Sequence, residues 1–187
     1  MFIQTEYTPN PQTLKFLPGK VVMVDGTAFF QNADEGINSP FAKRLFGIDG
    51  VEGVFFGSDF ITITKNQSID WQVMKPLVLG SIMDHYNSGD ETITVTNNKS
   101  NNSLKSDEND NDIVKQIKEL LDTRVRPAVA MDGGDIIYDS FKDGIVYLHM
   151  QGACSGCPSS TATLKMGIEN MLKHYVPEVL EVRPIDA

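Results

Sequence analysis

Residues 132–160 read DGGDIIYDSFKDGIVYLHMQGACSGCPSS, and the order of turns and apolar runs in this stretch decides the fold of the back half of the chain. The DGGD turn leads into a run over 136–141, and Lys142-Asp143-Gly144 leads into a second run over 145–150. β-branched and aromatic residues bounded by such turns are typical of two strands joined as a hairpin. The stretch therefore predicts a hairpin followed by a cysteine-containing loop.

Helical patterns lie on both sides of this hairpin. Upstream, Asp112 is placed to cap a helix, and Pro127 marks its expected end. Its apolar residues recur at helical spacing: Ile113, Ile117, Leu120, Leu121 and Val125. Downstream, residues 158–160 begin a second helix, and a short strand over 179–183 follows it. The predicted order is α-β-β-α-β.

The front half of the chain also mixes strands with helices. Ser39-Pro40 pairs a capping residue with a proline suited to the first helical position, and the apolar residues between Trp71 and Tyr86 fit one face of a second helix. The expected strands are Phe2–Glu6, Val21–Val24, Val51–Phe56 and Phe60–Thr64, the last two joined by a turn at 57–59. This pattern predicts an α+β domain.

A polar segment separates the two halves. Residues 97–112 read NNKSNNSLKSDENDND, with one apolar residue and no aromatic residue. Such a segment buries too little apolar surface to offset the entropy lost on ordering. The predicted fold class is therefore α+β, with two small α+β domains, residues 1–90 and 112–187, joined by a polar flexible linker over 91–111.

Composition and charge narrow the function. The chain has 187 residues, and its formal net charge of −9 opposes binding to nucleic acid or to an anionic membrane. No apolar run reaches the length of a membrane span, and the N-terminus MFIQTEYTPNP lacks the basic region of a secretory signal. We expect a cytoplasmic protein whose thiols stay reduced.

The chain's two cysteines, Cys154 and Cys157, lie in GACSGCPSS between a predicted strand and a predicted helix. A helix N-terminus offers unpaired N–H groups and a partial positive charge, which favour thiolate over thiol. Gly152 and Gly156 leave room for a bulky ligand to approach. We therefore expect exposed, anionic sulfur atoms in this loop.

Three interpretations of the cysteine pair are open. A thioredoxin-like dithiol also precedes a helix, although that fold needs more sheet than the one remaining strand. A structural zinc site needs four ligands, and none of His85, His149 and His174 has a spacing that requires ligation. Iron–sulfur clusters are commonly held by four thiolates, which two chains could supply around a two-fold axis.

The aspartates of the DGGD turn, Asp132 and Asp135, form another candidate site. Two carboxylates could serve as an acid–base pair or bind a cation. A Gly-Gly pair flanked by aspartates is more typical of a turn, and no further carboxylates or phosphate-binding loop accompany it. We therefore predict a turn without catalytic function.

Residues 121–179, which include DGGD and GACSGCPSS, resemble the NifU-like C-terminal domain of the Nfu family of iron–sulfur carriers. The front domain is similar to the N-terminal Nfu domain through TPNPQTLKFLPG, SPFAKRLFGIDGVEGVFFGSDFITITK and the DW and KP pairs near residues 70–76. Both domains in this order resemble mitochondrial and related bacterial members. Because no targeting presequence is visible, a bacterial cytoplasmic protein is expected, with a mature mitochondrial matrix protein as the alternative.

The resemblance implies that Cys154 and Cys157 bind half of a [4Fe-4S] cluster shared with a second chain. It also implies a non-enzymatic carrier that receives clusters from upstream assembly proteins and passes them to apo iron–sulfur proteins, with the front domain assisting recognition. Two alternatives are a thiol-disulfide oxidoreductase that uses the same cysteines and an adaptor whose cysteines bind zinc.

Overall fold

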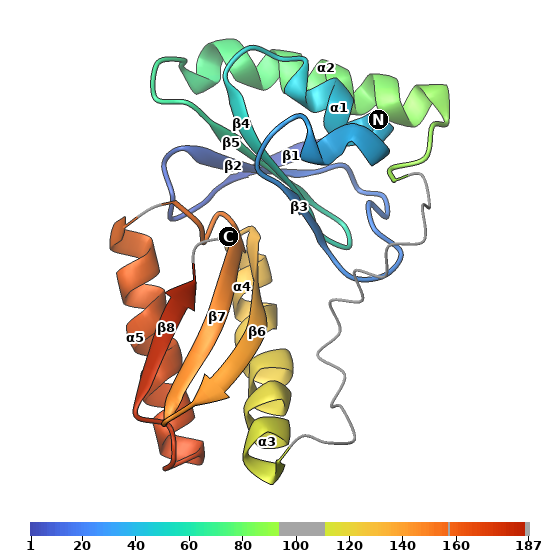
Figure 1. Cartoon of the computed structure of the whole chain (residues 1–187). Helices are drawn as coiled ribbons and strands as arrows, with labels where there is room; N and C mark the ends of the chain where they lie inside the picture. Colours follow the sequence, from blue (N-terminus) through green and yellow to red (C-terminus); the bar gives the residue numbers. More distant parts are fainter. Residues whose placement is uncertain (94–110, 157, 186–187) are drawn as a thin grey trace. The chain divides into compact units, whose positions relative to one another are not determined.

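The computed structural model describes residues 1–93, 111–156 and 158–185, with all their side chains except those of 158–160. The chain divides into two compact units, residues 1–100 and 101–187 (Figure 1). Most of the predicted linker, 91–111, falls outside the described residues. None of the described helices combines the length and the apolar character needed to cross a bilayer.

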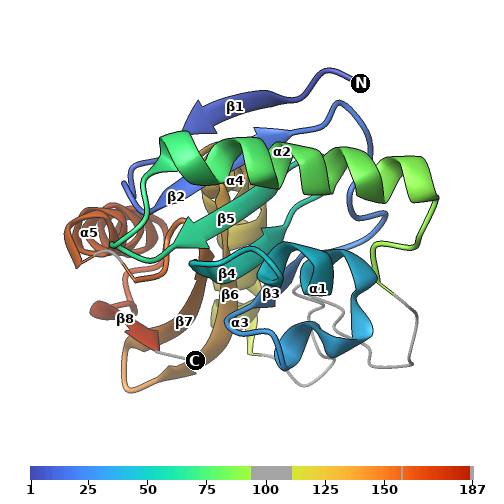
Figure 2. The ribbon, with the colours of Figure 1, turned by 90° about the horizontal axis from the view of Figure 1, so that it is seen from above.

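The first unit is an antiparallel sheet in the order β1-β2-β5-β4-β3, with two α-helices packed on one face (Figures 1 and 2). Its elements are β1 Gln4–Tyr7, β2 Thr13–Leu17, β3 Ala28–Phe30, the short 3-10 helix η1 Glu35–Asn38, α1 Pro40–Phe46, β4 Val51–Phe56, β5 Ile61–Lys65 and α2 Trp71–Ser88. The core between helices and sheet includes Phe41 and Leu45 of α1 and Val78 and Ile82 of α2.

The helices and the hairpin of this unit were predicted from the sequence, but one strand was placed wrongly. Ser39 caps α1 by accepting a hydrogen bond from the Ala42 N–H at 3.0 Å, and β4 pairs with β5 as expected. The predicted strand Val21–Val24 is a loop, in which the N–H of Val22 donates to the Ser58 carbonyl at 2.8 Å. Two strands were not predicted: β2 at Thr13–Leu17, between β1 and β5, and β3 at Ala28–Phe30, which pairs with β4.

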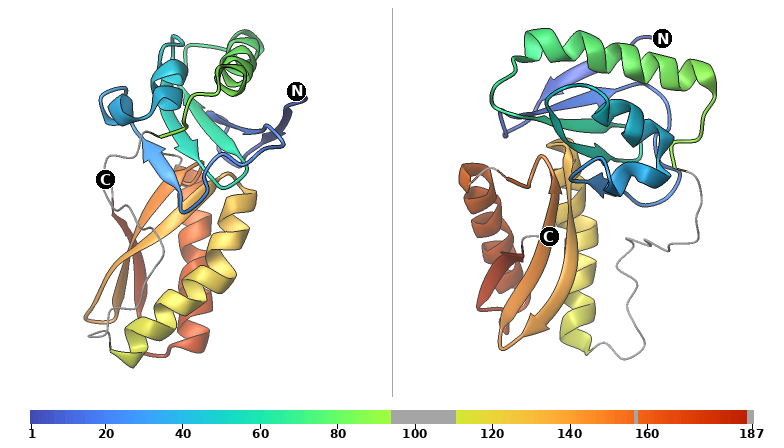
Figure 3. Two further views of the ribbon diagram at one scale, coloured as in Figure 1. Left: turned by 90° about the vertical axis from the view of Figure 1, so that its right-hand side faces the viewer. Right: turned by 45° about the horizontal axis from the view of Figure 1, so that its top comes forward.

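The second unit is a three-stranded sheet in the order β6-β7-β8, in which β6 and β7 are antiparallel and β7 and β8 are parallel. Its elements are α3 Asp112–Leu120, the π-helical turn η2 Leu121–Val125, α4 Arg126–Met131, β6 Gly134–Lys142, β7 Ile145–Gly152, α5 Pro158–Tyr175 and β8 Glu181–Ile185. The left view of Figure 3 shows α3 and α5 on the same face of this sheet. The predicted order α-β-β-α-β is confirmed, and both units are α+β.

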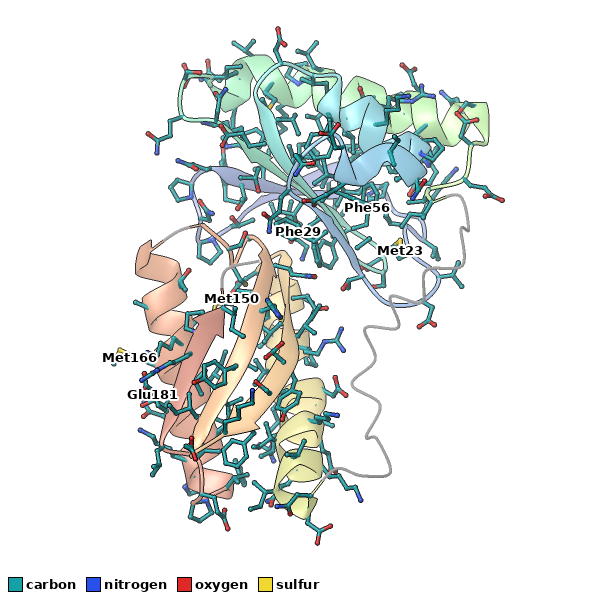
Figure 4. All side chains as sticks on the ribbon, viewed as in Figure 1. Met23, Phe29, Phe56, Met150, Met166 and Glu181 are labelled. Atoms are coloured by element: carbon teal, nitrogen blue, oxygen red, sulfur yellow. The ribbon has the colours of Figure 1, made fainter. Side chains whose placement is uncertain are left out.

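The core of the second unit lies between this sheet face and the helices. Val146, Leu148 and Met150 alternate along β7 and are buried, as the two-residue period of a strand requires. They pack with residues such as Ile117 of α3 and Leu172 of α5. Met150 lies near the end of β7 that leads to the cysteine loop, whereas Met166 projects outward from α5 and is 64% exposed (Figure 4).

The first helical segment of this unit differs from the prediction at both ends. Asn111, not Asp112, is the N-cap, because its side chain accepts the N–H of Ile113 at 3.4 Å. Pro127 does not end the helix, which continues to Met131. The π-helical turn at Leu121–Val125 separates two helical segments, and Pro127 lies in the first turn of the second, where a missing N–H removes no bond within that segment.

The hairpin turn between β6 and β7 sets which residues meet at the cysteine loop. Asp143 and Gly144 have φ of +52° and +79°, as a two-residue hairpin turn between right-twisted strands favours. The ladder runs from this turn to the pair Gly134–Gly152. The end of the DGGD turn therefore lies beside the start of the cysteine loop.

Candidate metal centre

The cysteine loop connects the end of β7 to the start of α5, as the sequence predicted. Gly152 has a φ of +64°, and its carbonyl accepts the N–H of Ser155 at 3.2 Å, which turns the chain sharply out of the strand. The hydroxyl of Thr161, in the first turns of α5, donates to the Cys154 carbonyl at 3.1 Å. The backbone around Cys154 is thus held at two points.

The DGGD turn packs directly against this loop. Gly133 has a φ of +84°, and its carbonyl accepts the N–H of Ala153 at 3.1 Å. Gly134 follows, and a Cβ built there would lie 2.6 Å from the Sγ of Cys154. The two motifs, about twenty residues apart in sequence, therefore form adjoining parts of one site.

Cys154 contradicts the prediction of an exposed thiolate. Its side chain is 6% exposed and belongs to the core cluster of the second unit. Burial, reinforced by the negative charges of Asp132 and Asp135, raises the pKa of the Cys154 thiol to about 12. Desolvation and two nearby carboxylates thus outweigh the attraction that the N-terminus of α5 was expected to exert. Cys154 is a buried thiol in this structure.

Asp135 is neutralised by a specific partner, Arg126 of α4. The guanidinium donates through Nε to Oδ1 at 2.8 Å and through Nη2 to Oδ2 at 2.7 Å, and Nη1 also donates to Asp122 at 3.0 Å. Asp135 is 3% exposed, and these hydrogen bonds raise the pKa of Arg126 above its usual value. The prediction that Asp135 serves a turn agrees with this arrangement, which anchors the turn to α4.

The histidines considered as ligands have other contacts in the structure. Cys157 lies outside the described residues. His149 contacts Asp139 at 3.4 Å, His174 packs edge-on against Tyr175, and His85 is buried against Phe41 in the first unit. Among the residues that the structure describes, no group of three His, Cys, Asp or Glu side chains could hold a metal ion. Any metal bound at this loop therefore needs ligands beyond the described part of one chain.

Gly134 and the contact between Arg126 and Asp135 are parts of the site that the sequence reasoning missed. Arg126 carries no local signal, because its contact with Asp135 depends on how α4 packs beside β6. Counting back from the Asp143-Gly144 turn would have brought residue 134 opposite residue 153, next to its actual partner Gly152, because a bulge between Tyr138 and Ser140 shifts the register by one residue. The register of the hairpin was the available signal.

Two family models match the chain. "Scaffold protein Nfu/NifU N terminal" matches residues 3–89, and "NifU-like domain" matches residues 117–183. The two matches correspond to the two units of the structure, and the second contains the DGGD turn and the cysteine loop.

Relatives are similar over nearly the whole chain. "NifU-like protein 4, mitochondrial" of Arabidopsis thaliana is 53% identical over 96% of this chain, which spans only 64% of that protein. "NFU1 iron-sulfur cluster scaffold homolog, mitochondrial" of Homo sapiens is 50% identical over 99% of this chain and 72% of its own length. The solution structure of a NifU-like protein from Saccharomyces cerevisiae is 28% identical and covers 51% of this chain and 87% of its own, with a TM-score of 0.46.

Proposed function

The chain belongs to the Nfu/NifU family of scaffold proteins, and on this premise we propose that it is an iron–sulfur cluster carrier rather than an enzyme. In this proposal Cys154 and Cys157 of each of two chains bind one [4Fe-4S] cluster. The cluster is the cargo, and the protein passes it to apo-proteins.

One observation carries this proposal. A Cys-x-x-Cys loop between a strand and a helix lies in a chain that is 50% identical, over 99% of its length, to a protein named an iron–sulfur cluster scaffold. Two sulfur atoms fill half of the four-thiolate set that such clusters commonly use. A second copy of the same loop on a two-fold axis supplies the other half. The raised pKa of Cys154 lowers the affinity for metal at neutral pH but does not prevent binding, because a coordinating metal displaces the proton of its thiol ligand.

Anaerobic reconstitution with iron and sulfide tests the proposal. We expect a brown protein that elutes as a dimer, with the Mössbauer signature of a [4Fe-4S] cluster. Cys154→Ser and Cys157→Ser should each remove the colour. Ala162→Ser, which adds the same hydroxyl at an exposed position of α5, should retain it. A wild-type chain that stays colourless and monomeric would show that the proposal is wrong.

The thiol-disulfide oxidoreductase alternative is less well supported. Redox-active cysteines are partly exposed and have lowered pKa values, whereas Cys154 is buried and its pKa is raised to about 12. The zinc adaptor alternative needs four ligands, and among the described residues no group of three His, Cys, Asp or Glu side chains could hold a metal ion. Metal analysis of protein purified without oxygen separates the three functions.

Partners and location are part of the proposal. A cluster carrier needs upstream cluster-assembly proteins as donors and apo iron–sulfur proteins as recipients. The relatives quoted above are named mitochondrial, which favours the mitochondrial matrix over the expected bacterial cytoplasm. Fractionation of the source cells tests the location.

A further inference from the structure

The Sγ of Cys154 is packed against the α-carbon of Gly134. A Cβ at residue 134 would lie 2.6 Å from this Sγ, 2.6 Å from the Gln151 carbonyl oxygen and 3.2 Å from the Cys154 nitrogen. Separations below about 3 Å are far inside van der Waals contact, so a methyl group cannot be added without displacement. The absence of a side chain at Gly134 is what makes this position of Cys154 available.

The glycine at 134 is required by this contact and not by its backbone conformation. Gly133 has a φ of +84°, in the region that glycine adopts most easily, whereas Gly134 begins strand β6 and is absent from the positive-φ residues of the described chain. Within this Gly-Gly pair, the two glycines therefore have different purposes. Gly133 forms the turn, and Gly134 makes room for Cys154.

Both sides of the contact are anchored, so neither backbone can easily yield. Arg126 binds Asp135, the residue after Gly134, through two hydrogen bonds of 2.7 and 2.8 Å. On the other side, the Ala153 N–H donates to Gly133 and the Thr161 hydroxyl donates to Cys154. The freest atom near Gly134 is the Sγ, because it can rotate about the Cα–Cβ bond.

We propose that Gly134 is a positioning residue, because the space beside its α-carbon, called the seat below, holds the Cys154 sulfur in a buried position. We also propose that this sulfur leaves the seat when Cys154 binds the cluster. The second statement rests on the proposed function. A cluster shared by two chains needs sulfur atoms that a second chain can approach, and Cys154 is only 6% exposed. A methyl group at residue 134 would displace the sulfur and favour its outward position, and the Gln151 carbonyl oxygen, also 2.6 Å from the added carbon, would have to shift as well.

The seat is tested by the rate at which iodoacetamide alkylates Cys154, followed by intact mass. Cys157→Ser makes Cys154 the only cysteine, and Gly134→Ala is added to it. The matched control is Gly167→Ala, which adds a methyl group to α5 where no atom beyond that helix lies within 4 Å. We expect alkylation at least about tenfold faster with Gly134→Ala and unchanged with Gly167→Ala.

A purely structural role is separated by measuring the free energy of unfolding of the same variants. Global opening accelerates alkylation by no more than the increase in the unfolded fraction. Equal rates in the two alanine variants, or an acceleration fully accounted for by lost stability, overturn the proposal. If Gly134→Ala does not fold, the Cys157→Ser protein without the alanine substitution is used instead. We expect iodoacetamide to alkylate its Cys154 at least about tenfold more slowly in the folded protein than in denaturant. Equal alkylation rates in the two conditions overturn the proposed seat.

The outward movement is tested by the rate of cluster reconstitution in chains that keep both cysteines. We expect Gly134→Ala to gain the cluster absorbance faster than wild type and Gly167→Ala to match wild type. Slower or unchanged reconstitution overturns the movement. A wild-type protein that binds no cluster overturns both the proposed function and this movement. The proposal about the seat is tested separately, because the alkylation experiment contains no iron.

Discussion

Arg126 forms an ion pair with the buried carboxylate of Asp135. Asp135 has a side-chain exposure of 5% and accepts two hydrogen bonds from the Arg126 guanidinium, and a third reaches it from the Ile136 N–H. Removing one partner of such a pair leaves a charge that burial disfavours, which typically costs 3–5 kcal/mol. We therefore expect Arg126→Gln to lower the free energy of unfolding of the second unit by about 3 kcal/mol, as measured by denaturant titration.

Two further variants make this prediction specific. Lys173→Gln removes an exposed ion pair with Glu169 on α5, so it should leave the stability nearly unchanged. Asp135→Asn combined with Arg126→Gln should lose less than the sum of the two single losses, because the buried charge is removed together with its partner. An Arg126→Gln variant as stable as Lys173→Gln would show that the pair does not anchor the turn.

At Cys154 the sequence supported the residue and its position but not its environment. A Cys-x-x-Cys pair after a strand and before a helix is a local pattern, and it placed Cys154 correctly between β7 and α5. Burial depends on what packs above the residue, and that is the DGGD turn, about twenty residues upstream. The helix dipole alone predicts a thiolate at Cys154, whereas desolvation and two nearby carboxylates favour the thiol.

At the scale of elements, α2 packs against α1 through His85, whose ring is buried like that of an aromatic core residue. The His85 ring stacks on Phe41 with centroids 3.8 Å apart and planes 5° apart, and the residue is 2% exposed. Its Nδ1 is buried without a hydrogen-bond partner among the described residues. Burial, with a smaller contribution from Arg44, lowers the pKa of His85 from 6.5, against an opposing effect of Asp90.

This lowered pKa predicts a pH-dependent stability of the first unit. The folded state prefers neutral His85, so its contribution is fully present above the ordinary pKa of 6.5 and is lost as the pH falls through the lowered value. Trp71, the only tryptophan, reports unfolding of this unit by fluorescence. Between about pH 7.5 and about pH 5.5, we expect wild type to lose stability and His85→Phe, which keeps the stacking, to lose less.

His174→Gln is the control for this titration. His174 lies on α5 in the other unit, so it should leave the pH dependence of the Trp71 signal as in wild type. If His85→Phe and wild type lose stability equally over this range, the pH dependence arises from other groups.

The strands that sequence reasoning placed best are those paired in hairpins. The hairpin β4–β5 and the hairpin β6–β7 are each joined by a short polar turn that contains a glycine. The misplaced strand also has turn residues on both sides, yet it does not pair. Val21–Val24 is rich in valine, but Gly19 and Gly26 on either side have φ of +68° and +69°, and the segment forms a loop. Strand propensity alone does not decide pairing.

Strand β2 was not predicted because it contains a buried charged residue, Lys15. Lys15 interrupts the apolar run of Thr13–Leu17, yet it is 7% exposed. Its ammonium lies 4.7 Å from the centre of the Phe60 ring and 3.4 Å from Glu6 on the neighbouring strand. These partners come from other parts of the chain, so the local pattern could not identify β2.

For the molecule as a whole, the proposed function couples cluster binding to dimerisation. One chain supplies two cysteines, and among the described residues no group of three His, Cys, Asp or Glu side chains could hold a metal ion. A cluster that needs four thiolates therefore exists only while two chains are together, and it stabilises the dimer by mass action. No single sequence displays this property, because in the proposed function the other half of the coordination sphere belongs to another copy.

Dilution of the reconstituted protein tests this coupling. We expect iron and sulfide analysis to give one four-iron cluster per two chains at high concentration. On anaerobic dilution, the cluster absorbance and the dimer fraction, measured together by sedimentation velocity, should decline in parallel. Ala162→Ser protein should follow the wild-type curve, because that exposed residue on α5 leaves both cysteines intact. Colour that persists in a sedimenting monomer would mean that one chain completes the site by itself, and a colourless dimer would mean that contacts other than the cluster hold the chains together.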